Sequence, residues 1–109
     1  MLAKDHRIRR PAQFAALIRA GRRGASRWAV VYVQPTVGPW RAGTVVSKAV
    51  GNSVERHRVV RRLRAIAAAR LPGIDPSLDV VVRALPGAAH ATYAQLDDAV
   101  CRALAKALR

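Results

Sequence analysis

The chain has 109 residues and a formal net charge of +14 at pH 7, with a sequence pI of about 11.9. This length predicts one domain, residues 1–109, whose core is large enough to fold unaided. The charge exceeds what solubility requires of a small domain and is typical of a protein that binds nucleic acid. Residues 1–70 hold 16 of the 20 lysines and arginines against two acids, so the excess charge belongs to one part of the molecule.

The composition also argues against a membrane protein and against one stabilised by disulfides. No apolar run approaches the roughly 18 residues of a spanning helix, and the opening MLAKDHRIRR is charged where a secretory signal is apolar. We therefore expect a cytoplasmic protein without a membrane partner. Cys101 is the only cysteine, and helical spacing groups it with the apolar residues of the last helix, so we expect a buried, inert thiol.

The first helix is predicted at residues 11–20. Pro11 suits the first turn of a helix, Gly21 supplies a C-terminal stop, and three large apolar residues repeat at helical spacing, namely Phe14, Leu17 and Ile18. The β-branched stretches at 29–34 and 42–48 flank the sequence Pro-Thr-Val-Gly-Pro. We expect these stretches to form two paired strands.

The second helix is predicted to begin near Asn52, after a break at Gly51. Asn52 or Ser53 can accept a hydrogen bond from the first-turn amides, and Glu55 suits the positive end of the helix dipole. At roughly 100° per residue, one arc of this helix is apolar and comprises Val59, Leu63, Ile66 and Ala67. The opposite arc is cationic and comprises His57, Arg58, Arg61, Arg62 and Arg64.

The cationic arc predicts a polyanionic ligand. Several guanidinium groups in one arc repel each other unless an anion lies among them, and each fits a phosphate through two parallel hydrogen bonds. Arg56 lies nearer the apolar arc, at the helix start, where it can reach toward the preceding strand. A merely solvated face is the plainer interpretation, but such a face normally mixes signs, and only Glu55 offsets the arginines here.

A short apolar strand at residues 78–83 and a third helix complete the chain. The run Val80-Val81-Val82 suits a central strand, and Thr92 with Gln95 predicts a capping box at the helix start. The predicted order is helix, two or three strands, helix, strand, helix, written α-β-β(-β)-α-β-α. This order indicates an α+β fold in which helices back one sheet.

Little in the sequence indicates catalysis by the protein itself. The six acids are scattered, His6, His57 and His90 are far apart along the chain, and no phosphate-binding glycine loop, metal-ligand spacing or nucleophile motif occurs. Single-stranded nucleic acid requires exposed aromatic side chains for stacking. Phe14 and Tyr32 are candidates for that role, and the alternative is that both belong to the core.

The segment at residues 47–64 resembles the signature of the bacterial ribonuclease P protein component, in which a strand leads through Gly-Asn into an arginine-rich helix. The matching residues are Ser47, Lys48, Val50, Gly51, Asn52, Val54, Arg56, Arg58, Arg61 and Arg64. The segments at 7–21, 30–33 and 79–86 resemble the family's basic arm with its first helix, its tyrosine-bearing strand and its last strand. The resemblance therefore covers essentially the whole chain.

The resemblance implies a non-catalytic protein subunit of an enzyme whose catalyst is RNA. In this family the protein binds a large catalytic RNA, and the ribonucleoprotein is an endoribonuclease that removes the 5′ leader of precursor tRNA with Mg²⁺ held mainly by the RNA. The implied partners are the catalytic RNA and precursor tRNA, without an obligate protein partner. The implied fold has a mixed sheet in which the arginine helix is the crossover between parallel strands.

The resemblance also implies two sets of binding residues. The RNA-binding residues are Lys48, Asn52, Arg56, His57, Arg58, Arg61, Arg62 and Arg64. The leader-binding cleft is formed by Phe14, Ile18 and Tyr32, which makes Phe14 and Tyr32 partly exposed. No catalytic residue and no metal ligand is implied in the protein. Three positions depart from the family pattern, because His57 replaces an asparagine and Ala49 and Val60 each replace a lysine.

Two other functions compete with this interpretation. A generic basic RNA-binding or ribosome-associated protein would use its arginines only to neutralise phosphates. A long disordered basic tail would favour that function, and this sequence has none. A DNA-binding domain would place the arginine helix in the major groove, but the sequence lacks the short preceding helix of a helix-turn-helix.

Overall fold

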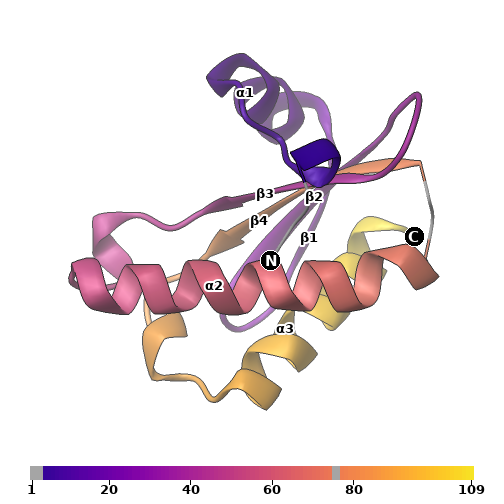
Figure 1. The fold of residues 1–109 in the computed structure, drawn as a ribbon. Coiled ribbons are helices and arrows are strands. Elements are labelled where there is room, and N and C mark those ends of the chain that lie inside the picture. Colours follow the sequence, from indigo (N-terminus) through magenta and orange to yellow (C-terminus); the bar gives the residue numbers. More distant parts are fainter. Residues whose placement is uncertain (1–3, 75–76) are drawn as a thin grey trace.

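A four-stranded sheet forms the middle layer of the molecule, which a computed structural model describes over residues 4–74 and 77–109. Helix α1 covers one face of the sheet and helices α2 and α3 cover the other (Figure 1). The helices are α1 (Pro11–Ala20), α2 (Ser53–Arg70) and α3 (Tyr93–Ala107). The strands are β1 (Arg22–Ala25), β2 (Ala29–Pro35), β3 (Arg41–Val45) and β4 (Leu78–Ala84).

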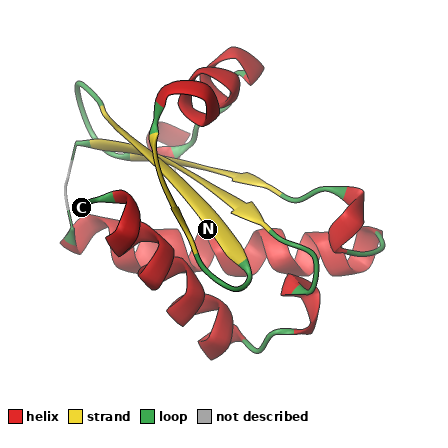
Figure 2. Ribbon diagram, turned by 180° about the vertical axis from the view of Figure 1, so that it is seen from behind, coloured by secondary structure: helices red, strands yellow, loops and turns green. Residues whose placement is uncertain are grey.

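The sheet is mixed, and its strand order is β1-β2-β4-β3. β1 pairs with β2 and β2 with β4 in antiparallel fashion, whereas β3 and β4 are parallel. Helix α2 connects these two parallel strands on the face that α3 also covers, as the view from behind in Figure 2 shows. The predictions of an α+β fold, a mixed sheet and an arginine-rich crossover helix are therefore confirmed.

The predicted pairing of segments 29–34 and 42–48 was wrong. β4 lies between β2 and β3, and Val81 is opposite both Tyr32 on β2 and Gly43 on β3. The physical reason is the apolar run at 80–82, whose side chains alternate between the two faces and are all buried. Such a strand is most stable where it has a neighbour on each side and a helical layer on each face. The predicted central position of this strand is confirmed.

Two further differences concern the strands before α2. The optional third strand is present as β1, and it lies so close to α3 that a Cβ on Gly24 would be 2.0 Å from the carbonyl oxygen of Ala103. β3 ends at Val45 rather than near residue 48, because residues 48–50 form a 3₁₀ turn ahead of α2.

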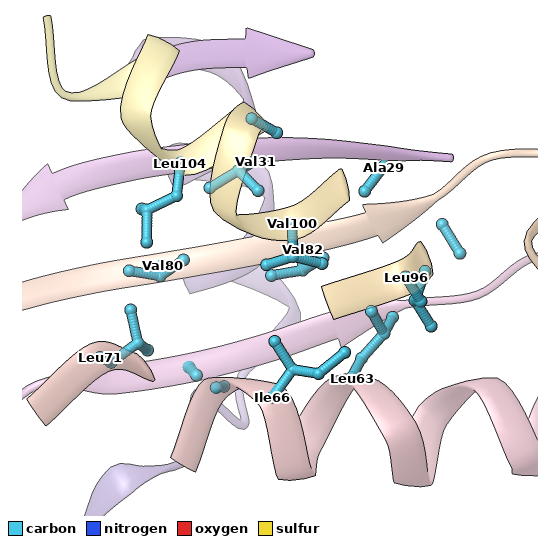
Figure 3. Packing of buried hydrophobic residues seen from close by; sticks show 14 of the residues in the cluster. Ala29, Val31, Leu63, Ile66, Leu71, Val80, Val82, Leu96, Val100 and Leu104 are labelled. Atoms are coloured by element: carbon cyan, nitrogen blue, oxygen red, sulfur yellow. The ribbon is translucent and has the colours of Figure 1, made fainter. Parts of the chain in front are cut away.

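The main core lies between the sheet and the two helices α2 and α3 (Figure 3). Leu63 and Ile66 of α2 point toward the sheet, where they meet the face that carries Val80 and Val82, and Leu104 of α3 approaches the same face. Each such side chain contributes about 1.5–3 kcal/mol by burial. The apolar arc predicted for the second helix is confirmed, since its four residues are all buried.

A smaller apolar cluster lies beneath α1 on the opposite face. Its buried members are Ile8, Leu17, Val30, Tyr32 and Val81, and Phe14 and Ile18 pack against them half-buried. The expected partial exposure of Phe14 is thus observed, but Tyr32 is only 5% exposed and belongs to the core. Tyr32 is buried because β2 lies between two paired strands and α1 covers its ring.

The helix boundaries agree with the capping signals in the sequence. The amides of Glu55 and Gln95 donate to the side chains of Asn52 and Thr92 at 2.9 and 3.1 Å, so both predicted helix starts are confirmed.

No helix within residues 4–74 and 77–109 is both long and apolar enough to cross a membrane.

Candidate nucleic-acid interface

The position of α2 depends on a reciprocal cap at its first turn. The Glu55 amide donates to Asn52 Oδ1, and the Asn52 amide donates to Glu55 Oε1, each at 2.9 Å. A Cβ on Gly51 would lie 2.9 Å from Glu55 Cβ and 2.6 Å from Glu55 Oε1. The glycine of the Gly-Asn pair therefore makes room for the glutamate that completes the cap.

One flank of α2 is anchored through its arginines. Arg58 Nη2 donates to the carbonyl oxygen of Ala89 at 3.1 Å, and Arg62 Nη1 donates to that of Ala91 at 2.9 Å. Further along, Arg70 binds Asp97 of α3 through two hydrogen bonds of 3.0 and 2.6 Å. Arg58 and Arg62 thus attach α2 to the segment between β4 and α3, and Arg70 attaches it to α3 itself.

The outermost face of α2 carries His57 and Arg61, both exposed. Arg58, Arg62 and Arg64 were expected in the same exposed arc but are half-buried on the flanks of the helix. They are half-buried because α2 packs against β3 and also against α3 and the turn at residues 88–90. Lys48, in the turn before α2, is exposed.

The other flank of α2 faces the edge strand β3. Arg64 lines a small pocket of about 60 Å³ together with Arg7, Phe14 and the backbone of β3 around Gly43. Arg56, near the start of α2, is half-buried, and its Nε has no hydrogen-bond partner among the residues described. Its approach toward the preceding strand stays a prediction.

A groove lies between α1 and β3. It has a volume of about 490 Å³ and is lined by Arg9, Pro11, Phe14, Ala15, Thr44 and Val45. Phe14 lies directly on the backbone of β3, since a Cβ on Gly43 would be 2.5 Å from Phe14 Cε1. A half-buried aromatic ring beside an arginine offers stacking and charge to a single strand of nucleic acid.

The structure brings one member of each predicted set together at one edge of the sheet. Arg64 of the α2 set and Phe14 of the cleft set line the same pocket, whereas Tyr32 lies buried in the cluster beneath α1. The sequence reasoning missed Arg7 and Arg9 as members of this surface. The signal available was the basic run at residues 7–10, which carries three arginines.

The remaining reactive groups are engaged in packing. The His6 ring stacks on Trp40 with the centroids 4.0 Å apart, and Cys101 is half-buried rather than fully buried. Burial and the nearby Asp97 carboxylate raise the pKa of the Cys101 thiol, which keeps it protonated. Among the residues described, no three His, Cys, Asp or Glu side chains converge to hold a metal ion.

The fold and this surface define a class of small, strongly basic α+β proteins in which a cationic crossover helix lies beside a groove with an aromatic wall. The Ribonuclease P family model matches residues 2–108. The chain belongs to the ribonuclease P protein family, whose members are the protein subunit of a ribonucleoprotein endoribonuclease and not its catalyst.

Its relatives and structural neighbours carry the same family name. The ribonuclease P protein component of Micrococcus luteus is 48% identical over 100% of this chain and 92% of its own length, and that of Kocuria rhizophila is 46% identical over 100% and 97%. The solved Staphylococcus aureus RNase P protein superposes with a TM-score of 0.82 at 27% identity, over 92% of this chain and 93% of that one. The Thermotoga maritima protein, at 20% identity and a TM-score of 0.79, shares the fold.

The attachment of α2 to α3 should depend on pH. The Arg70 guanidinium lowers the pKa of Asp97 below its ordinary value of 3.8, so the pair stabilises the fold fully above that value and loses its effect as pH falls through the lowered pKa. Urea unfolding of the natural chain and of Asp97→Asn should therefore differ at pH 7 and converge as the pH falls through the lowered pKa of Asp97. Arg70→Met should abolish the same difference, and a gap between natural chain and Asp97→Asn that is constant with pH would contradict this assignment.

Proposed function

We propose that this chain is the protein subunit that binds the catalytic RNA of ribonuclease P through α2 and the 5′ leader of precursor tRNA through the groove beside Phe14. Its role is to assist the removal of the leader, which yields the mature 5′ end of the tRNA. The observation that carries the proposal is the meeting of Arg64 and Phe14 in one pocket at the edge of β3, in a chain of this family.

In this proposal the chain positions RNA and leaves the chemistry to its partner. The exposed His57 and Arg61 and the basic groove supply cations that displace counterions from phosphates, which strengthens binding most at low salt. Mg²⁺ would be held by the catalytic RNA, because the residues described offer no cluster of carboxylates for it. The cytoplasm, where precursor tRNA is made, would be its site of action.

The geometry also bears on the alternative of a generic RNA-binding protein. Such a protein needs cations but no aromatic groove, and it would bind precursor and mature tRNA equally. Here the absence of a Cβ at Gly43 allows the Phe14 ring to lie on the backbone of β3. An aromatic ring fixed beside the cationic helix favours the interpretation that the protein distinguishes precursor tRNA, which carries a single-stranded leader, from mature tRNA.

The decisive experiment is cleavage of precursor tRNA at low Mg²⁺ by a bacterial ribonuclease P RNA, with and without this protein. We expect the protein to stimulate release of a leader of the correct length and to make the holoenzyme bind precursor more tightly than mature tRNA. Salt-sensitive RNA binding without stimulation would instead establish the generic function.

The two arginines Arg61 and Arg58 should respond differently to removal. Arg61→Ala should weaken binding of the catalytic RNA, reduce the slope of log K against log salt by about 0.7–0.9, and leave the melting temperature unchanged. Arg58→Ala should reduce the slope similarly and also lower the melting temperature, because its hydrogen bond to Ala89 is lost. An unchanged salt slope in Arg61→Ala would show that this side chain does not contact phosphate.

Phe14 should act on the leader rather than on the catalytic RNA. Phe14→Ala in the holoenzyme should reduce the preference for precursor over mature tRNA by about tenfold, since base stacking on an aromatic ring contributes about 1–3 kcal/mol. Leu17→Ala is the matched control, because Leu17 is on the same helix but only 2% exposed. It should lower stability and leave the preference of the folded protein intact, and an equal loss of preference in both variants would contradict a stacking role.

A further inference from the structure

Arg83 lies on the central strand β4, on the face of the sheet that α1 covers in part. Its neighbours along the strand, Val82 and Ala84, belong to the core beneath α2 and α3, so alternation directs Arg83 to the opposite face. Its partners across the sheet are Val30 on β2 and Val45 on β3. An arginine therefore stands between two valines in the interior of the sheet.

The Arg83 side chain has no counter-ion in the part of the chain that the structure describes. Its Nε is buried without a hydrogen-bond partner, and its guanidinium takes part in no ion pair within residues 4–74 and 77–109. The acid on the same face of β4 is Asp79, but its carboxylate is already paired with Arg41, which donates two hydrogen bonds of 2.9 and 2.7 Å to it. The Nε of Arg83 thus lacks an acceptor among the residues described.

An unpaired arginine here is unfavourable for the free protein. Burial of a donor such as the Arg83 Nε without an acceptor costs stability. Two other arginines have a buried Nε without a partner, namely Arg56 and Arg58 of α2. Both of these lie on α2, the helix that binds RNA in the proposed function, so a phosphate is the acceptor to consider for the same unpartnered group of Arg83.

The groove beside α1 brings a phosphate within reach of Arg83. Val45, the direct neighbour of Arg83 on β3, lines this groove together with Phe14 and Arg9. Arg83 does not itself line the groove. Its backbone is one strand away from Val45, about 4.8 Å, and an arginine side chain is long enough to span that distance. A strand whose base stacks on Phe14 would have its backbone between two arginines, Arg9 at the rim and Arg83 on the floor.

We propose that Arg83 binds a phosphate of the single-stranded 5′ leader on the floor of this groove and contributes to the preference for precursor tRNA. The inference rests on the proposed function and adds to it a binding residue on the central strand. A guanidinium binds phosphate through two parallel hydrogen bonds, and a bound phosphate would supply the acceptor that Arg83 lacks in the free protein. Removal of the charge should therefore weaken leader binding without destabilising the fold.

The test compares Arg83→Met and Arg83→Lys with the natural chain, each assembled with the catalytic RNA. Methionine preserves much of the apolar stem and removes the charge. We expect Arg83→Met to bind precursor tRNA about tenfold more weakly, with a salt slope smaller by about 0.7. It should bind mature tRNA as before, and its free protein should melt at the same or a higher temperature. Arg83→Lys should recover most of the salt slope.

Arg102→Met is the matched control, because Arg102 is an exposed arginine on α3 that pairs with Asp98 at 2.8 Å, away from the groove. It should leave precursor and mature tRNA binding unchanged. Equal precursor binding by Arg83→Met and the natural chain would overturn the proposal. An equal loss for precursor and mature tRNA, or failure of Arg83→Lys to restore the salt slope in a protein that melts normally, would overturn it as well.

The outcome is separable from that of the proposed function. If the natural holoenzyme shows no preference for precursor, the proposed function fails before any Arg83 variant is compared. If the natural holoenzyme shows the preference and Arg83→Met retains all of it, only the role of Arg83 fails. Phe14→Ala measured beside it separates stacking from phosphate binding, because loss of the ring should leave the salt slope unchanged.

Discussion

The constraint on which the structure depends is the apolar strand β4, whose two faces must both be removed from water. Val80 and Val82 face α2 and α3, whereas Val81 faces α1. α1 has only ten residues and covers its face in part, which leaves Phe14 half-buried and a groove beside β3. The groove therefore exists because the two faces of the sheet are covered unequally. Two helices cover one face, and the single short helix on the other face leaves the edge at β3 uncovered.

In the proposed function, the crossover helix α2 has a structural role and a binding role that use different parts of its surface. Leu63 and Ile66 dock it on the sheet, and Arg58 and Arg62 donate to carbonyl oxygens on the loop that follows β4. The exposed face is left to cations such as Arg61. A rigidly held helix presents its charges in a fixed array, so less conformational entropy is lost when an RNA backbone binds.

Local signals in the sequence were sufficient for the elements but not for their pairing. The capping residues Asn52 and Thr92 determine helix starts through contacts with residues three positions later, so both starts could be predicted from the sequence. The partner of β3 could not, because β4 follows α2 in the chain, and neighbouring segments with β-branched residues suggest a hairpin. Tyr32 was assigned to the cleft by the family resemblance, and its burial could not be predicted because it depends on how far α1 and the flanking strands extend over it.

The sequence by itself determined the class of the protein, since the charge excess, the Gly-Asn helix start and the arginine spacing are properties of composition and short-range order. Only the tertiary structure decided which arginines remain open to RNA, because that depends on the loop packed against α2 and on the edge of β3. It also decided the position of Arg83. The sequence shows only a single charge at the end of an apolar strand, whereas the strand register shows that Arg83 lies between Val30 and Val45. Side-chain environment is set by residues remote in the chain, and the sequence alone does not bring those together.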